Sequence, residues 1–97
     1  MLIKMHFETE DQIISQLKEL IEKDKEIVNK SVNLSKDTLL HYAAYHKKAK
    51  IINFLLSVGA NKNAENSFKL VPKDVIYVDD DNSDRDVVDN LVKILSQ

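Results

Sequence analysis

Apolar residues recur every three or four positions in several separate stretches, and each stretch is bounded by residues that begin or end helices. In the first stretch, Thr9-Glu10-Asp11-Gln12 has the form of a capping box, so a helix is predicted from there to about Lys23. Five apolar residues share one side of that helix: Ile13, Ile14, Leu17, Leu20 and Ile21. The other positions are mostly polar, which predicts an amphipathic helix whose apolar face is buried against another element.

The middle of the chain predicts two consecutive helices. Thr38 can cap a short helix over residues 38–46, after which two lysines interrupt the apolar pattern. A second helix is predicted over residues 49–58, and Gly59 follows it at a position that favours a left-handed backbone. The residues expected to be buried on this second helix are Ile51, Ile52, Leu55 and Leu56.

The flanking segments have different patterns. Residues 24–37 mix charged and amide side chains with isolated apolar residues, which predicts an ordered connection with one helical turn over residues 25–29. After the polar residues 60–70, Pro72 suits the first position of another short helix. Ser83-Asp84-Arg85-Asp86 is an acidic variant of the capping box and predicts the start of a last helix. The residues expected to be buried on that helix are Val87, Val88, Leu91, Val92 and Leu95.

Composition narrows both fold and function. The 97 residues include one glycine and one proline, too few for the tight turns of an all-β protein, so the expected fold class is all-α. The lack of cysteine excludes disulfides and thiolate metal sites and fits a cytoplasmic protein. The net charge of -2 does not give the positive field that phosphate binding needs, so nucleic acid is not an expected partner. No signal peptide or membrane span is expected.

A period of 33 residues appears within the second half of the chain, for example between His41 and Asp74. Residues 38–64, TLLHYAAYHKKAKIINFLLSVGANKNA, contain forms of a T-P-L-H-x-A-A opening, an I-V-x-x-L-L second helix and a G-A-D-x-N-A exit. This segment closely resembles the ankyrin repeat. Residues 24–41 look like the start of a repeat, and residues 65–97 look like a terminal capping repeat.

The resemblance implies a short ankyrin-repeat-like helical solenoid of paired antiparallel helices with finger loops. Residues 1–97 would then form a single domain. Within it, residues 1–32 supply an N-terminal helix and a connecting loop, residues 33–65 one full repeat, and residues 66–97 a C-terminal capping repeat. Because so few repeats are present, we expect either that the N-terminal helix packs on Ile51, Ile52 and Leu55 of the second helix of the full repeat, or that a partner completes the stack.

The chain departs from the family pattern at five positions. Leu39 stands in place of the proline of the T-P-L-H opening. Lys36, Lys47 and Lys69 stand where the family prefers glycine, so these turns either adopt a strained left-handed backbone or rearrange. Val71 replaces the threonine that caps the first helix of a repeat, so the last repeat should lack that cap.

Candidate chemistry is sparse. His41 and His46 are five residues apart, which is not the spacing of a helical zinc pair, and His41 is expected to be buried and bonded to Thr38. The acidic run over residues 79–83 suggests calcium, but a calcium loop starting there lacks glycine at its sixth position and glutamate at its twelfth. No nucleophile motif or phosphate-binding loop is present. We therefore expect no catalytic residues, no metal, no cofactor and no small-molecule substrate, unless the chain completes another protein's active site.

The resemblance also implies a binding surface, on the concave side formed by the first helices and the finger loops. The corresponding residues are Leu34, Ser35, Asp37, Tyr42, Tyr45, His46, Ser67, Phe68 and Leu70. Aromatic side chains are common interface anchors. Two alternatives stay open: Phe68 could fold down onto the final repeat, and Tyr42 could pack against a neighbouring first helix.

The function implied is protein binding. We expect an interaction module that binds a protein target, as an adaptor, effector or inhibitor, through its concave face. The alternative is a structural or self-assembling subunit that completes a homo-oligomer or a larger repeat array. A membrane partner is not expected, and the expected location is cytoplasmic, which is compatible with delivery into a host cell. Residues 1–7 are compatible with a strand, a helix extension or disorder.

Overall fold

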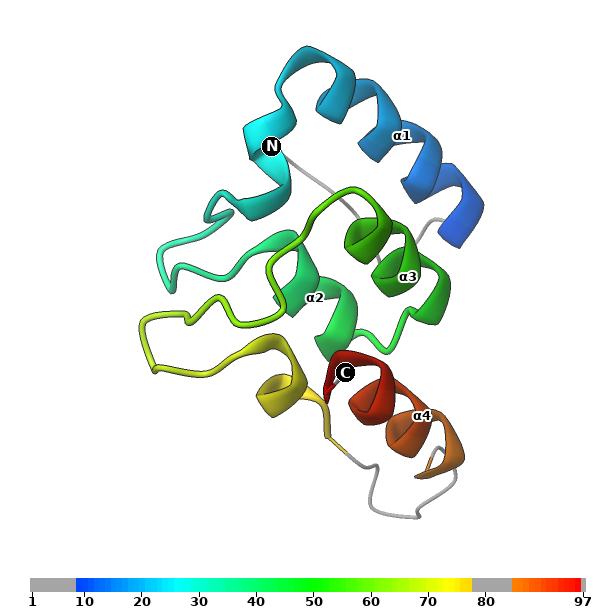
Figure 1. The fold of residues 1–97 in the computed structure, drawn as a ribbon, viewed down its shortest axis with the longest axis vertical. Coiled ribbons are helices and arrows are strands. Elements are labelled where there is room, and N and C mark those ends of the chain that lie inside the picture. Colours follow the sequence, from blue (N-terminus) through cyan, green and yellow to red (C-terminus); the bar gives the residue numbers. More distant parts are fainter. Residues whose placement is uncertain (1–8, 78–84, 97) are drawn as a thin grey trace.

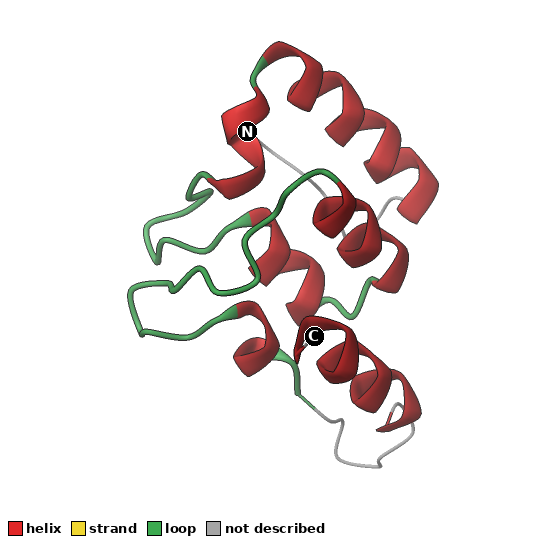
Figure 2. Cartoon of the chain, in the orientation of Figure 1, coloured by secondary structure: helices red, strands yellow, loops and turns green. Residues whose placement is uncertain are grey.

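The structure is a computed structural model that describes residues 9–77 and 85–96. Every regular element in these two ranges is helical, which confirms the all-α fold class. The elements in order are α1 (Glu10–Lys23), the 3-10 helix η1 (Lys25–Asn29), α2 (Leu39–Tyr45), α3 (Ala49–Ser57), the 3-10 helix η2 (Pro72–Val75) and α4 (Arg85–Ser96). Figure 1 shows α1, α3 and α4 in succession along one side of the molecule, with α2 and η2 along the other. Figure 2 shows two long loops beyond α2 and η2.

Helix α1 begins with the predicted capping box. The Thr9 hydroxyl accepts a hydrogen bond from the Gln12 amide (3.2 Å), and the Gln12 side chain accepts one from the Thr9 amide (3.1 Å). Ile13 and Leu17 are fully buried, whereas the other three apolar residues of the predicted face are half-buried. The helix contacts α3, so the expected packing of the N-terminal helix on the second helix of the pair is confirmed.

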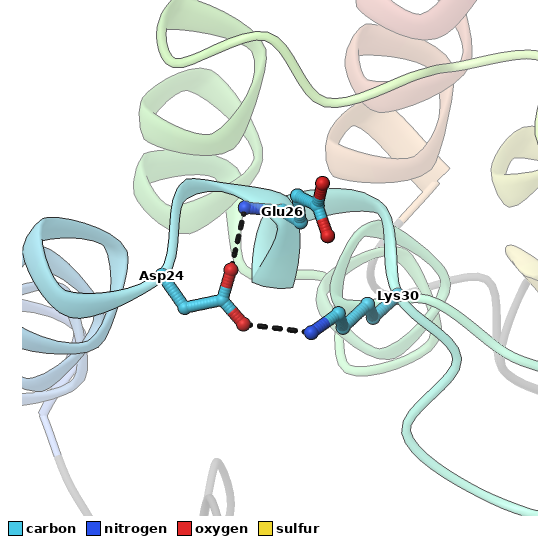
Figure 3. A network of polar contacts seen from close by, with 3 residues as sticks. All are labelled: Asp24, Glu26 and Lys30. Carbon is cyan, nitrogen blue, oxygen red and sulfur yellow. Dashed lines mark hydrogen bonds and ion pairs between the residues drawn. The ribbon is translucent and has the colours of Figure 1, made fainter.

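The 3-10 helix η1 forms the helical turn predicted over residues 25–29. A network of three polar residues spans the connection from α1 through η1 (Figure 3). One carboxylate oxygen of Asp24 accepts from the Glu26 amide (3.1 Å) and the other from the Lys30 ammonium (2.7 Å). The Lys30 ammonium, followed by the Glu26 amide, holds the pKa of Asp24 below its ordinary value, and the Asp24 carboxylate raises the pKa of Lys30. Both side chains are about half exposed, so water screens their attraction.

Asn29, at the end of η1, ties this connection to the end of α3. Its side-chain nitrogen donates to the Gly59 carbonyl (3.1 Å), and its side-chain oxygen accepts from the Asn61 amide (2.7 Å). Gly59 itself has a φ of 94°, so the left-handed residue predicted after the second helix is confirmed.

The core is one cluster to which all four α-helices contribute. On α2 and α3 its fully buried members are Leu39, Leu40, Ala43, Ala44, Ile51, Ile52 and Leu55. The two small alanines leave room for neighbouring elements, and α2 contacts both η1 and η2. Leu56, which was expected to be buried, is half-buried at the edge of this cluster.

Three lysines adopt the left-handed backbone that most side chains disfavour. The φ angles are 60° at Lys36, 57° at Lys47 and 61° at Lys69. These are the positions at which the sequence predicted either strain or rearrangement, and the turns keep the left-handed conformation. A lysine there costs about 1–2 kcal/mol through the close approach of Cβ to the backbone.

The last helix pair departs from the prediction in two respects. The segment that begins at Pro72 forms only a single 3-10 turn, and Val71 provides no side-chain cap, as expected. On α4, Val88, Leu91 and Leu95 are buried, but Val87 and Val92 are 45% and 36% exposed, so their predicted burial is wrong. The three buried residues define a narrow stripe, and Val87 and Val92 flank it on a helix that ends the row and packs on one side.

Several sequence predictions fall outside the described residues. These are the conformation of residues 1–7, the acidic run over residues 79–83 and the start of the acidic capping box before α4. Across residues 9–77 and 85–96, no helix combines the length and apolar character needed to cross a lipid bilayer.

Candidate functional site

The nine residues predicted to contact a partner lie on α2, at its C-terminal cap His46, and on two loops. We call these loops the first finger (residues 30–37) and the second finger (residues 61–70). Three apolar residues of the fingers are open to solvent: Leu34 is 102% exposed, Phe68 69% and Leu70 37%. On α2, Tyr45 is 52% exposed. Phe68 therefore points to solvent, which removes the alternative that it folds down onto the final repeat.

The two fingers are joined directly by hydrogen bonds. The Ser67 amide donates to the Ser35 carbonyl (2.8 Å). The Asp37 carboxylate accepts from Asn66 Nδ2 on one oxygen (2.9 Å) and from Asn33 Nδ2 on the other (3.0 Å). Because charge-assisted hydrogen bonds are stronger than neutral ones, Asp37 first serves to hold the fingers together. Its contact with a partner stays a prediction.

Each finger is shaped by an asparagine that the sequence analysis did not single out. Asn33 Oδ1 accepts from the Asp37 amide (3.1 Å), and Asn66 Oδ1 accepts from the amides of Phe68 (2.9 Å) and Leu70 (3.0 Å). Such side-chain-to-backbone bonds replace the pairing that a short loop cannot make with itself. The two asparagines lie one repeat period apart, so comparison at an offset of 33 residues could have found them.

His41 links α2 to the second finger. It is 1% exposed, and its Nδ1 lies 3.1 Å from the Thr38 amide while its Nε2 lies 2.8 Å from the Leu70 carbonyl. An amide can only donate and a carbonyl can only accept, so Nδ1 is the acceptor and Nε2 carries the proton. The predicted structural role of His41 is confirmed, and its bond to Leu70 positions the second finger.

Aromatic rings gather at the end of α2. His46 is stacked on Tyr42 (ring centroids 6.3 Å apart) and meets Tyr45 edge-on (5.2 Å). Tyr45 also contacts Tyr77 (5.5 Å), whose ring lies 3.9 Å from the Lys47 ammonium. Tyr77 was missed by the sequence analysis because it follows η2, where no motif marks it.

Tyr42 and Tyr45 play different parts in this cluster. Tyr42 is half-buried, and its hydroxyl lies 3.0 Å from the donor Asn33 Nδ2, so it packs and is bonded within the molecule. Tyr45 presents more of its ring to solvent. Between α2 and η2 lies a shallow hollow of about 200 Å³, and the residues lining it are Asp37, His41, Tyr42, Tyr45 and Val75.

Among the described residues, no group of three or more His, Cys, Asp or Glu side chains comes together as a metal site. His41, which lines the hollow, is occupied on both ring nitrogens. The surface is thus a set of exposed apolar and aromatic side chains on hydrogen-bonded loops.

Comparison with known proteins identifies one repeat within the chain. The curated proteins gave no match to the chain. The family model of the ankyrin repeat matches residues 35–67, which span part of the first finger, the α2–α3 pair and most of the second finger. Helical pairing, left-handed turns and the Thr38–His41 bonds agree with this match, so residues 35–67 of the chain form an ankyrin repeat.

Proposed function

We propose that the chain binds a protein target through the finger face, defined as the nine residues predicted to contact a partner. The observation that supports this proposal is the exposure of Leu34, Phe68 and Leu70 on two hydrogen-bonded loops, together with the exposure of Tyr45 on α2. Exposed apolar side chains that cluster on one surface are typical of protein-binding sites. Ankyrin repeats in general serve as protein-interaction modules, which favours the same conclusion.

The hydrogen bonds of the fingers give this surface a further advantage. Loops that order only on binding lose conformational entropy at that moment and bind more weakly. Here Asp37 and Asn66 connect the fingers, and His41 anchors the second finger to α2, before any partner arrives. A partner would meet a preformed surface, and little of the binding free energy would go into ordering the loops.

In this proposal the whole chain acts as one binding unit without catalytic activity. The segments on either side of the repeat at residues 33–65 would cover its two ends, and the finger face would do the binding. The target would be met in the cytoplasm, where the chain would act as an adaptor, effector or inhibitor.

Affinity capture from a lysate of the source cells tests the finger face. The intact chain is compared with the variant Leu34→Ala, Tyr45→Ala, Phe68→Ala, in which only exposed side chains are shortened. The matched control is Val58→Ala, Val87→Ala, Val92→Ala, which also shortens three exposed apolar side chains but lies off the finger face. We expect a captured protein that the first variant loses and the control retains, with both variants giving the circular dichroism spectrum of the intact chain. Loss with the control alone would contradict the proposal.

A second candidate function is self-assembly, and one observation favours it. Val87 and Val92 are exposed on α4, the last helix of the row, where a further repeat or a second copy could cover them. Light scattering of the intact chain and of the Val87→Ala, Val92→Ala variant distinguishes the two functions. If the intact chain is a dimer and the variant is a monomer, self-assembly is supported. If the intact chain is a monomer at all concentrations, self-assembly is excluded.

A further inference from the structure

Charge is distributed unevenly along the chain. Residues 27–77, which include both fingers, carry eight lysines and three acidic residues. Residues 9–26 carry six acidic residues and three lysines, and residues 78–97 carry six acidic and two basic residues. Although the net charge of the chain is -2, residues 27–77 form a basic central segment between two acidic segments.

Part of this basic central segment lies where the fingers are joined. The Ser67 amide donates to the Ser35 carbonyl over 2.8 Å, which places the two fingertips against each other. Four exposed side chains are close neighbours of these serines in sequence, and we call them the fingertip patch: Leu34, Lys36, Phe68 and Lys69. The patch thus presents two apolar and two cationic side chains around one fixed hydrogen bond.

The two lysines of the patch stand at equivalent positions of successive repeats. Both have a left-handed backbone, with φ angles of 60° and 61°, a conformation that favours glycine. Side chains kept in a disfavoured backbone conformation are often found where they serve a function. Within residues 9–77 and 85–96, neither ammonium group forms an ion pair or a side-chain hydrogen bond. Both charges are available to a partner.

We propose that the fingertip patch binds an acidic protein segment that also carries apolar side chains. Carboxylates of the segment would pair with Lys36 and Lys69, and its apolar side chains would contact Leu34 and Phe68. This inference rests on the proposed function and adds the chemistry of the partner to it. Charge complementarity selects an acidic partner, and the exposed apolar pair favours a protein over a nucleic acid, whose backbone presents phosphates.

A peptide probe tests this chemistry directly. The probe is a short fluorescein-labelled peptide rich in glutamate and leucine, and its counterpart has lysine in place of glutamate. Binding to the intact chain is followed by fluorescence anisotropy in about 0.1 M and about 1 M salt. We expect the acidic peptide to bind more tightly than the basic one, and its affinity to fall at high salt because exposed ion pairs are screened.

The variants separate loss of charge from loss of fold. Lys36→Gly, Lys69→Gly removes both charges while relieving the left-handed strain, so the variant should be more stable and yet bind the acidic peptide about three- to tenfold more weakly. The control Lys23→Gln, Lys25→Gln removes the same number of charges from exposed positions on α1 and η1 and should bind as the intact chain does.

Four results would overturn the inference. They are equal affinity for the two peptides, unchanged binding by the glycine variant, equally tight binding of a short RNA oligonucleotide, and a salt-sensitive dimer that depends on the two lysines. The lysate experiment keeps the two proposals distinct. Suppose that the Leu34, Tyr45 and Phe68 variant no longer captures a protein, but the glycine variant still captures it in about 1 M salt. The proposed function then stands, and this inference is wrong. If the intact chain captures nothing, the proposed function falls and the peptide result still decides the fingertip chemistry.

Discussion

Asn66 in the second finger donates a hydrogen bond from Nδ2 to the carboxylate of Asp37 in the first finger over 2.9 Å. Asn33, in the first finger, donates to the other carboxylate oxygen over 3.0 Å. The Asp37 side chain therefore connects the two fingers. Asn66 is only 8% exposed, and without this acceptor its amide would be left without a partner in a buried place.

Removal of this carboxylate should destabilise the chain. We expect Asp37→Ala to lower the free energy of unfolding by about 1–3 kcal/mol, because two amides lose a charged acceptor. Urea unfolding followed by circular dichroism measures the change. Leu70 occupies the equivalent position of the next finger and makes no side-chain hydrogen bond, so Leu70→Ala should cost less than about 1 kcal/mol. Equal losses for the two variants would show that the network does not support the fold.

The left-handed lysines predict gains in stability. Lys36→Gly, Lys47→Gly and Lys69→Gly should each raise the free energy of unfolding by up to about 1 kcal/mol, since glycine avoids the steric cost of the left-handed backbone but loses more entropy on folding. Thermal unfolding of the single variants measures these gains. The control is Glu19→Gly, at an exposed position inside α1, where glycine should lower stability by about 1 kcal/mol. A loss at all three lysine positions would contradict the role of backbone strain.

The first helix of the matched repeat has a threonine cap and η2 has none. Exchange of threonine and valine at these two positions should therefore change the free energy of unfolding in opposite directions. Thr38 caps α2 through the His41 amide and also bonds the His41 ring, so Thr38→Val should lower the free energy of unfolding by about 1–2 kcal/mol. Val71 precedes η2 at the capping position but provides no side-chain cap, and Val71→Thr should raise the free energy of unfolding by about 0.5–1 kcal/mol. Thr38→Val replaces a hydroxyl by a methyl group, and Val71→Thr replaces a methyl group by a hydroxyl. Each variant therefore keeps nearly the side-chain volume of the original residue. The same sign for both in urea unfolding would rule out capping as the cause.

The network of Asp24 and Lys30 predicts a dependence of stability on pH at both extremes. The pKa of Asp24 is lower in the folded chain than in the unfolded chain, so its contribution is present above about pH 4 and is lost as the pH falls through the folded pKa. The pKa of Lys30 is raised, so its contribution is present below its unfolded pKa and is lost as the pH rises through the folded value. Asp24→Asn should therefore reduce the change in stability between neutral and acidic pH.

Urea unfolding of Asp24→Asn and of the intact chain at neutral pH and near pH 3 measures this difference. The control is Asp89→Asn, an exposed residue on α4 for which the structure gives no such network. An acid response of Asp24→Asn identical to that of the intact chain would show that solvent screening cancels the interaction.

The sequence by itself determined the local structure and the ankyrin repeat in the middle of the chain. The ends of the helices are marked by the Thr9–Gln12 capping box, by Thr38 and by Gly59, through hydrogen bonds and backbone angles that depend on near neighbours. The structure places α1, α2 and α3 where these signals predict them. The motifs around residues 38–64 identified the ankyrin repeat because they recur at fixed spacing within one segment.

Only the tertiary structure decided which apolar residues are covered and how the fingers are joined. Val87 and Val92 fit the helical pattern of α4 as well as Val88 does, but a helix at the end of a row is covered on one side, and the pattern does not say which side. The bonds from Asn66 to Asp37 and from His41 to Leu70 join residues 29 apart in sequence, and their geometry depends on how successive repeats stack. Local signals act over one or two turns of chain, whereas burial and the binding surface depend on contacts between repeats, which form only when the chain folds.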